Sequence, residues 1–179
     1  MTSVSHNKLV IDQIVRAFPV DSVPPSDKIL LESQSENQEA IDTAEAFAGR
    51  TWNSMTAEEL RYNYVSLSYF SPRAISYYLP GYMVAELTDR GSIDVAAERI
   101  DYCLSETLAS TTADSILAWF TLEQLVAIKN YYVIRMLNLI DPDSFSRGTA
   151  PWDRDIERAF VNVLKWIEFH RARGSMASS

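Results

Sequence analysis

Residues 54–87 constrain the fold of this chain more than any other stretch, because they combine two helix-start signals with the densest run of aromatic residues. Thr56 followed by Glu59 is a capping box, in which the Thr hydroxyl accepts from the Glu59 amide and the Glu59 carboxylate accepts from the Thr56 amide. Ser71-Pro72 is a second start, with Ser as the N-cap and Pro at the first helical position. The stretch therefore predicts a helix after each signal.

The second of these helices is expected to stop early. Pro80 disfavours helical geometry at Leu79, the residue before it, and Gly81 adds backbone freedom. We therefore predict a kink or a break at Leu79-Pro80-Gly81, with another helical piece from there to residue 87.

Helix signals recur along the rest of the chain, as apolar residues spaced by three and four positions next to capping residues. Gly49 stands where a left-handed C-cap is expected, and Thr121 with Gln124 forms a second capping box. The further helices predicted in this way are 8–18, 36–48, 92–104, a long helix that begins at 121, and 152–173.

No segment shows a convincing alternation of strand type, although Ile29-Leu30-Leu31 is apolar enough to anchor against the body or to form a short strand. We predict an all-α, single-domain bundle of about six to seven helices over 1–173, followed by a disordered tail at 174–179. The predicted core consists of large residues on the inward stripes: Trp52, Leu60, Phe70, Leu79, Ile100, Val126, Val133 and Phe160.

Residues 70–83 read FSPRAISYYLPGYM. This combination of a Ser-Pro start, a Tyr pair and a Leu-Pro pair, preceded by Trp52 and Leu60, resembles an uncharacterised family of small bacterial all-helical proteins of unknown function. The likeness covers about 41–139, so the N-terminal lead and the helix at 152–173 are departures from it. The resemblance implies an all-helical architecture and supplies no catalytic residues.

The composition is that of a globular protein. The chain has 179 residues, of which 47% are hydrophobic and 22% charged, enough for one substantial core. No apolar run approaches the ~20 residues that span a bilayer, and the first residues lack the order of a signal peptide. We therefore expect a cytoplasmic protein without membrane contact, in which the single Cys103 forms no internal disulfide.

Charge is distributed unevenly along the chain. Residues 1–146 carry 20 acidic and 10 basic side chains, whereas 147–173 carry 4 acidic and 6 basic. Nucleic-acid binding depends on clustered cations that displace counterions from phosphates. An acidic body of this kind argues against direct nucleic-acid binding.

Motifs for catalysis or cofactor binding are absent from the sequence, which contains no nucleophile elbow, P-loop, HExxH, GxGxxG or CxxC pattern. We predict no catalytic residues, no cofactor and no metal site. Cys103 is interpreted as a buried small hydrophobe, and His170 as a cation near a helix C-terminus.

Acidic residues at helical spacing form the candidate binding surface. Asp94, Glu98 and Asp101 are four and three positions apart, and Glu36 and Glu39 lie in a run of acids without a base. A solvated face, a partner-binding face and a cation site remain open as interpretations. Six tyrosines between 62 and 82 are too many for all of them to be buried, since each hydroxyl needs a partner. The three that we assign to the binding surface are Tyr77, Tyr78 and Tyr82.

Two hypotheses follow. In the first, the protein is a non-catalytic inhibitor of the immunity-protein or antitoxin type, whose acidic helix faces and tyrosines cover the basic surface of a protein partner, possibly a toxin. In the second, it is a small enzyme or ligand-binding domain with a pocket beside the Leu79-Pro80 break.

Overall fold

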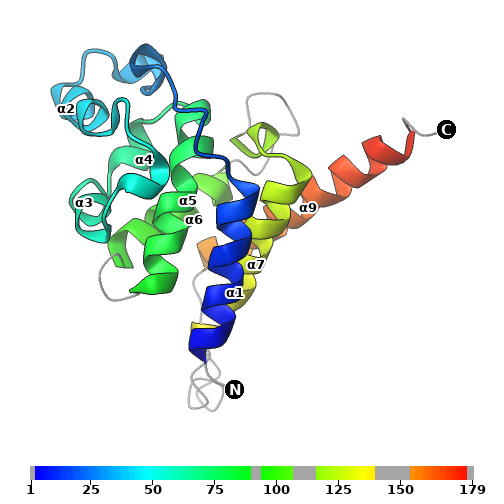
Figure 1. Ribbon diagram of the computed structural model, residues 1–179. Coiled ribbons are helices and arrows are strands. Elements are labelled where there is room, and N and C mark those ends of the chain that lie inside the picture. The colour runs from blue at the N-terminus through cyan, green and yellow to red at the C-terminus, as the bar shows by residue number, and fades with distance from the viewer. Residues whose placement is uncertain (1–2, 90–93, 107–115, 140–153, 177–179) are drawn as a thin grey trace.

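Helix α5 (Pro72–Thr88) is the central element of the computed structural model, which describes residues 3–89, 94–106, 116–139 and 154–176 (Figure 1). Twelve of its 17 residues are buried, and it packs against elements from both halves of the chain. The other α-helices in the described ranges are α1 (Ser3–Ala17), α2 (Gln38–Phe47), α3 (Ala57–Tyr62), α4 (Ser66–Tyr69), α6 (Asp94–Glu106), α7 (Leu122–Leu139) and α9 (Arg154–Met176). Short 3-10 helices are η1 (Ser26–Lys28), η2 (Glu32–Gln34), η3 (Trp52–Ser54) and η5 (Ile116–Trp119).

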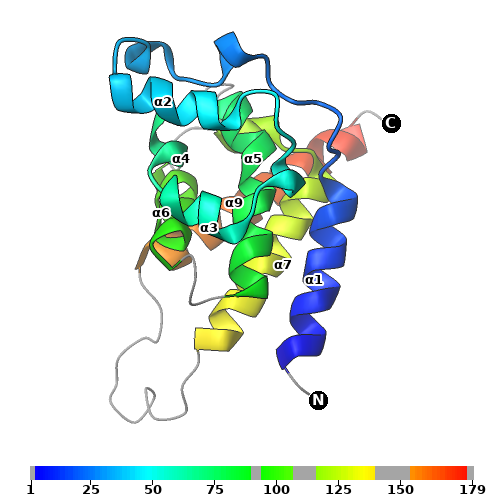
Figure 2. The same ribbon diagram turned by 60° about the vertical axis from the view of Figure 1, so that its left-hand side comes forward.

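The long helices form the bundle. Helices α1 and α7 lie side by side and antiparallel, as Figures 1 and 2 show, and two pairs of amide side chains tie them together. The Asn130 amide donates to Gln13 at 2.7 Å, and Asn138 donates to Asn7 at 3.3 Å. Helix α9 packs on α6 and α7, and its last turns project beyond the body (Figure 1). The prediction of an all-α bundle is confirmed.

Helices α2, α3 and α4 lie at one end of the bundle, away from α9 (Figures 1 and 2). The segment before α2 is fastened to the start of α5 by an isolated antiparallel bridge between Leu30 and Phe70. The Leu31 amide donates to the Tyr69 carbonyl at 2.8 Å, and the Ser71 amide donates to the Ile29 carbonyl at 2.7 Å. The apolar segment 29–31 therefore anchors the lead against the body.

The capping signals are confirmed. Thr56 and Glu59 form the reciprocal capping box, and the Ser71 hydroxyl accepts from the Ala74 amide at 3.2 Å. Gly49 follows α2 with a φ of 72°, the left-handed geometry that glycine adopts without strain. Gln124 and Thr121 also exchange hydrogen bonds, at 2.9 and 3.2 Å. Local chemistry alone therefore determined where several helices begin.

The predicted break at Leu79-Pro80-Gly81 is wrong, because α5 continues through all three residues. A proline inside a helix costs about 3 kcal/mol through the missing hydrogen bond and the clash with the preceding turn. Leu79 is fully buried and Pro80 and Gly81 are buried beside it, so the packing of this helix outweighs the local penalty.

Several helix boundaries also differ from the predictions, since α1 begins at Ser3 instead of residue 8 and α6 ends at Glu106 instead of residue 104. The helix that follows Thr56 ends at Tyr62. Helix α9 continues to Met176, which contradicts a disordered tail from 174, since Gly174 lowers helix stability without terminating the helix. The predicted start at Ser92 and the linker at 141–150 lie outside the described residues.

The core prediction is correct for Trp52, Leu60, Phe70, Leu79 and Ile100, which are all buried. It is wrong for Val126, Val133 and Phe160, which are only partly buried. Helix α7 is apolar on almost every side, so its sequence fits more than one inward stripe. The face that is buried carries Leu125, Ala127, Ile128, Tyr131, Tyr132 and Arg135.

Candidate functional site

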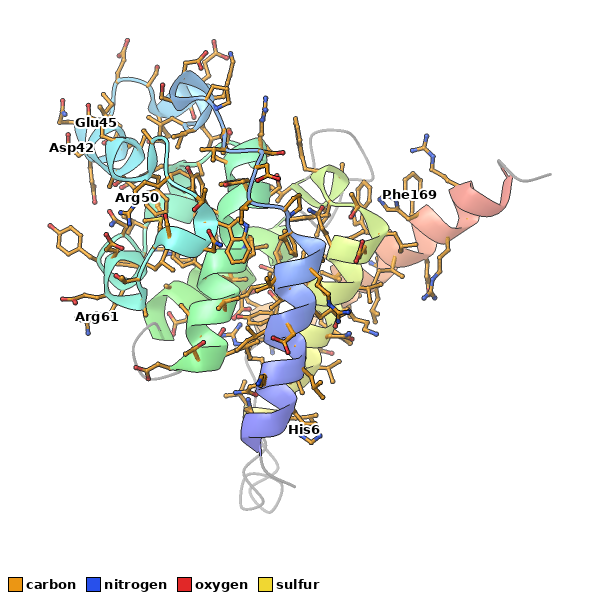
Figure 3. All side chains as sticks on the ribbon, in the orientation of Figure 1. His6, Asp42, Glu45, Arg50, Arg61 and Phe169 are labelled. Carbon is orange, nitrogen blue, oxygen red and sulfur yellow. The ribbon has the colours of Figure 1, made fainter. Side chains whose placement is uncertain are left out.

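The acidic side of α2 is the predicted binding region that remains on the surface. Glu36 and Glu39 are exposed, as are Asp42 and Glu45, whose side chains point away from the body in Figure 3. The Asn37 side chain caps the helix, accepting from the amides of Glu39 and Ala40. An acid in the first turn also interacts favourably with the helix dipole, so the local structure is compatible with the charge it displays.

The nearest cations in sequence have partners of their own. Lys28 lies 3.7 Å from Asp27, and Arg50 contacts Glu59 at 2.8 Å. The Arg50–Glu59 pair and the Thr56 cap lower the pKa of Glu59 to about 2. Among the described residues, no ion pair links a cation to Glu39, Asp42 or Glu45.

Two tyrosines accompany these acids. Tyr69 on α4, which packs against α2, lies close enough to Glu39 for the two groups to interact. Burial and then Glu39 raise the pKa of Tyr69, with a smaller contribution from Tyr64 and an opposing one from Arg99. Tyr64 is 37% exposed and Tyr69 is partly exposed. We call this region, formed by Glu36, Glu39, Asp42, Glu45, Tyr64 and Tyr69, the α2 surface.

The assignment of Tyr77, Tyr78 and Tyr82 to a binding surface is wrong, because all three are buried in the core. Their hydroxyls are satisfied by backbone carbonyls of surrounding turns. Tyr77 donates to Val20 at 2.6 Å, Tyr78 to Phe47 at 2.8 Å, and Tyr82 to Asn63 at 3.0 Å. The sequence does not show these carbonyl acceptors, because only the folded chain brings them to α5. All three hydroxyls can therefore be buried.

The predicted acidic face of α6 is also divided. Glu98 is exposed, Asp101 is only 3% exposed, and the side chain of Asp94 lies outside the described part of the chain. Asp101 turns inward because Arg135 on α7 provides a cation for it. The prediction that Asp101 belongs to a partner-binding face is therefore wrong.

Asp101 belongs to a buried group of charged and phenolic side chains that sequence reasoning missed. We call it the core ion cluster: Glu86 on α5, Asp101 on α6, and Tyr131, Tyr132 and Arg135 on α7. The available signal was an arginine on α7 and a glutamate on α5, each with an apolar residue on either side in the sequence.

A cavity of about 260 Å³ lies beside Gly81. Its walls come from α1, η3, α3 and the second half of α5, and most of them are apolar: Val15, Trp52, Asn53, Met55, Ala57, Gly81, Val84, Ala85, Thr88 and Asp89. The predicted break is absent, yet a pocket does lie next to the predicted position. Its volume is slightly below the ~300 Å³ at which pockets for drug-sized molecules begin.

Other candidate chemistry has structural explanations. Cys103 is buried, and its thiol donates to the Leu67 carbonyl at 3.5 Å. His170 lies in an aromatic group with Trp166 and Phe169 on α9. Within the described ranges, no three His, Cys, Asp or Glu side chains are grouped to hold a metal ion. Every helix in those ranges also lacks the length or the apolar character of a bilayer-spanning segment.

Comparison with known proteins gives one match. The sequence model of a family described as "Family of unknown function (DUF6714)" matches residues 27–146. The chain belongs to this family. The match begins before α2 and includes the α2 surface, the cavity residues of α5 and the core ion cluster, whereas α1 and α9 lie outside it. No curated protein and no solved structure matches the chain.

Proposed function

We propose that this family member binds a protein partner with a basic surface through the α2 surface, as a cytoplasmic inhibitor of the immunity-protein or antitoxin type. The observation that supports the proposal is the exposure of Glu36, Glu39, Asp42 and Glu45 in a segment without a base, next to partly exposed tyrosines. Closely spaced like charges add their potentials and steer a cationic partner, while tyrosines provide contact area with little loss of entropy.

The α2 surface replaces most of the region expected from the sequence. Glu36 and Glu39 belong to both regions, and Glu98 on α6 is exposed but lies on a different helix. Arg99 acts on Tyr69 and so provides a cation at the edge of the surface. A bound basic protein would therefore approach α2 from the side that carries Asp42 and Glu45 (Figure 3).

The proposal is tested with a matched pair of charge-reversed proteins. One carries Glu39→Lys, Asp42→Lys and Glu45→Lys; the control carries Glu123→Lys, Glu157→Lys and Glu168→Lys, which are exposed positions on α7 and α9. Both change three charges, so an effect of net charge alone appears in both. Affinity purification from the source cells identifies the partner, and binding rates are then measured with the purified pair at several salt concentrations.

We expect the α2 variant to lose association rate while the control retains it. Charges are screened over ~8 Å at physiological salt, so association of the unaltered protein should slow as salt rises, with a nearly constant dissociation rate. Equal binding by the two variants, or a partner whose association ignores salt, would exclude the α2 surface as its binding site.

The cavity beside Gly81 favours a second candidate function, the binding of a small apolar molecule. The pocket is mostly apolar and half open to solvent, and its volume of about 260 Å³ is large enough for a single small ring. Toluene is a suitable probe, with the indole N–H signal of Trp52 in a ¹H–¹⁵N spectrum as the readout. Val84→Phe, which fills the cavity, should abolish the shift, whereas Val161→Phe on α9 should not. An unshifted Trp52 signal at saturating toluene would eliminate this candidate.

A further inference from the structure

Arg135 lies between two buried carboxylates. Its Nε donates to Glu86 Oε1 at 2.9 Å, and its Nη1 donates to Asp101 Oδ1. The side chains are 8% exposed for Arg135 and 5% for each acid. One guanidinium on α7 therefore links α5 to α6 out of contact with water.

The formal charges of this cluster do not balance. Two ionised carboxylates facing one guanidinium leave an excess negative charge among the described residues. Burial disfavours an uncompensated charge, and a carboxyl group in that position binds a proton instead.

The two carboxyl groups are not equivalent. Both oxygens of Glu86 accept hydrogen bonds, one from Arg135 and one from the Tyr131 hydroxyl. Asp101 accepts from Arg135 and lies near the Tyr132 hydroxyl, which is buried and has no hydrogen bond of regular geometry among the described residues. A proton on Asp101 removes the excess charge.

We propose that Asp101 takes up and releases a proton near neutral pH, so that the contact of α6 with α5 and α7 is a pH-sensitive element of the core. The groups that act on Asp101 are Arg135 and Tyr132 from α7 and Glu86 from α5. From α9, the Asn162 amide donates to the carbonyls of Leu104 and Ser105 near the end of α6, and it does not titrate.

The balance of these influences agrees with the charge count. The pKa of Asp101 is raised to about 7, mainly by burial and to a smaller extent by Glu86. Arg135 and Tyr132 oppose this rise. Burial alone would lower the pKa of Arg135, but Tyr131, Asp101 and Glu86 raise it, so the guanidinium remains charged.

A raised carboxyl pKa in the folded state has a defined effect on stability. Between the ordinary Asp pKa of about 4 and a pKa of about 7, the folded protein binds a proton that the unfolded chain does not. The folding equilibrium constant therefore falls about tenfold for each unit of pH increase in this window and no further above it.

Two measurements test the proposal. The ¹³C shift of the Asp101 carboxyl in the unaltered protein should titrate near pH 7, with the signal assigned by its absence in Asp101→Asn. The unfolding equilibrium of Asp101→Asn should lose the tenfold-per-unit dependence between pH 4 and 7. Glu98→Gln, which removes an exposed acid three positions earlier on α6, should retain that dependence.

A carboxyl midpoint at or below pH 4 overturns the proposal, as does the same pH dependence in Asp101→Asn and in the unaltered protein. If Asp101→Asn fails to fold, the carboxyl titration of the unaltered protein still decides the question. A midpoint near 7 supports the proposal in that case also.

Discussion

The Trp52 carbonyl oxygen lies 2.8 Å from the position that a Cβ on Gly81 would occupy. The backbone of η3 thus rests directly on α5, at the point where the sequence indicates a break. Gly81 is required there for this close approach and not for its backbone conformation, since its φ is not positive. The same contact forms part of the wall of the cavity.

Gly81→Ala should lower the free energy of unfolding by about 1–3 kcal/mol, because the added methyl group pushes against backbone that cannot move independently. Denaturant titration measures the change. Gly174→Ala is the matched control: it is also helical, but open space surrounds its Cβ position, so its stability should be unchanged or slightly higher. Equal stability of Gly81→Ala and the unaltered protein would show that η3 moves freely away from α5.

Tyr82→Phe should destabilise the protein by about 1–3 kcal/mol, because the buried Ser66 hydroxyl and the partly buried Asn63 carbonyl would lose their hydrogen-bond partner. Its hydroxyl lies 2.5 Å from the Ser66 hydroxyl and donates to the Asn63 carbonyl at 3.0 Å. Tyr62→Phe provides the comparison, since Tyr62 is 86% exposed and should change by less than ~0.5 kcal/mol. Thermal and chemical unfolding of the two variants measure the difference.

Arg135→Met should destabilise the protein by about 3–5 kcal/mol, since it leaves Glu86 and Asp101 buried without their cation. Arg61→Met, at an exposed position, controls for the loss of one positive charge. The deficit of Arg135→Met should shrink when the acids are protonated, so unfolding is measured at low and neutral pH. A deficit that does not depend on pH would indicate lost packing and no electrostatic role.

The Glu59 cap should have the opposite pH dependence from Asp101. The pKa of Glu59 is lowered to about 2 by Arg50 and Thr56, so its stabilising contribution is present above the ordinary Glu pKa of 4.5 and is lost as pH falls from there towards 2. Glu59→Gln should therefore show a shallower acid transition than the unaltered protein. Glu58→Gln, at the exposed neighbouring position, should leave that transition as it is.

The sequence by itself determined the helical class and several helix starts. The signals at Thr56, Ser71 and Thr121 depend on hydrogen bonds within three residues of one another, so they need no information about the rest of the chain. The Ser-Pro, Tyr-Tyr and Leu-Pro pattern also indicated a family of unknown function, which the match to residues 27–146 confirms.

Only the tertiary structure decided which polar groups are buried. The helix sequences around Tyr82 and Asp101 permit either an exposed or a buried position for these side chains. Tyr82 is buried with Asn63 as its partner, 19 positions away, and Asp101 with Arg135, 34 positions away. The continuity of α5 through Pro80 was decided in the same way, since long-range packing outweighed a local penalty of about 3 kcal/mol. The spacing of residues within one helix identifies neither the hydrogen-bond and ion-pair partners of these side chains nor the packing energy of α5. Both come from segments that meet only in the folded chain.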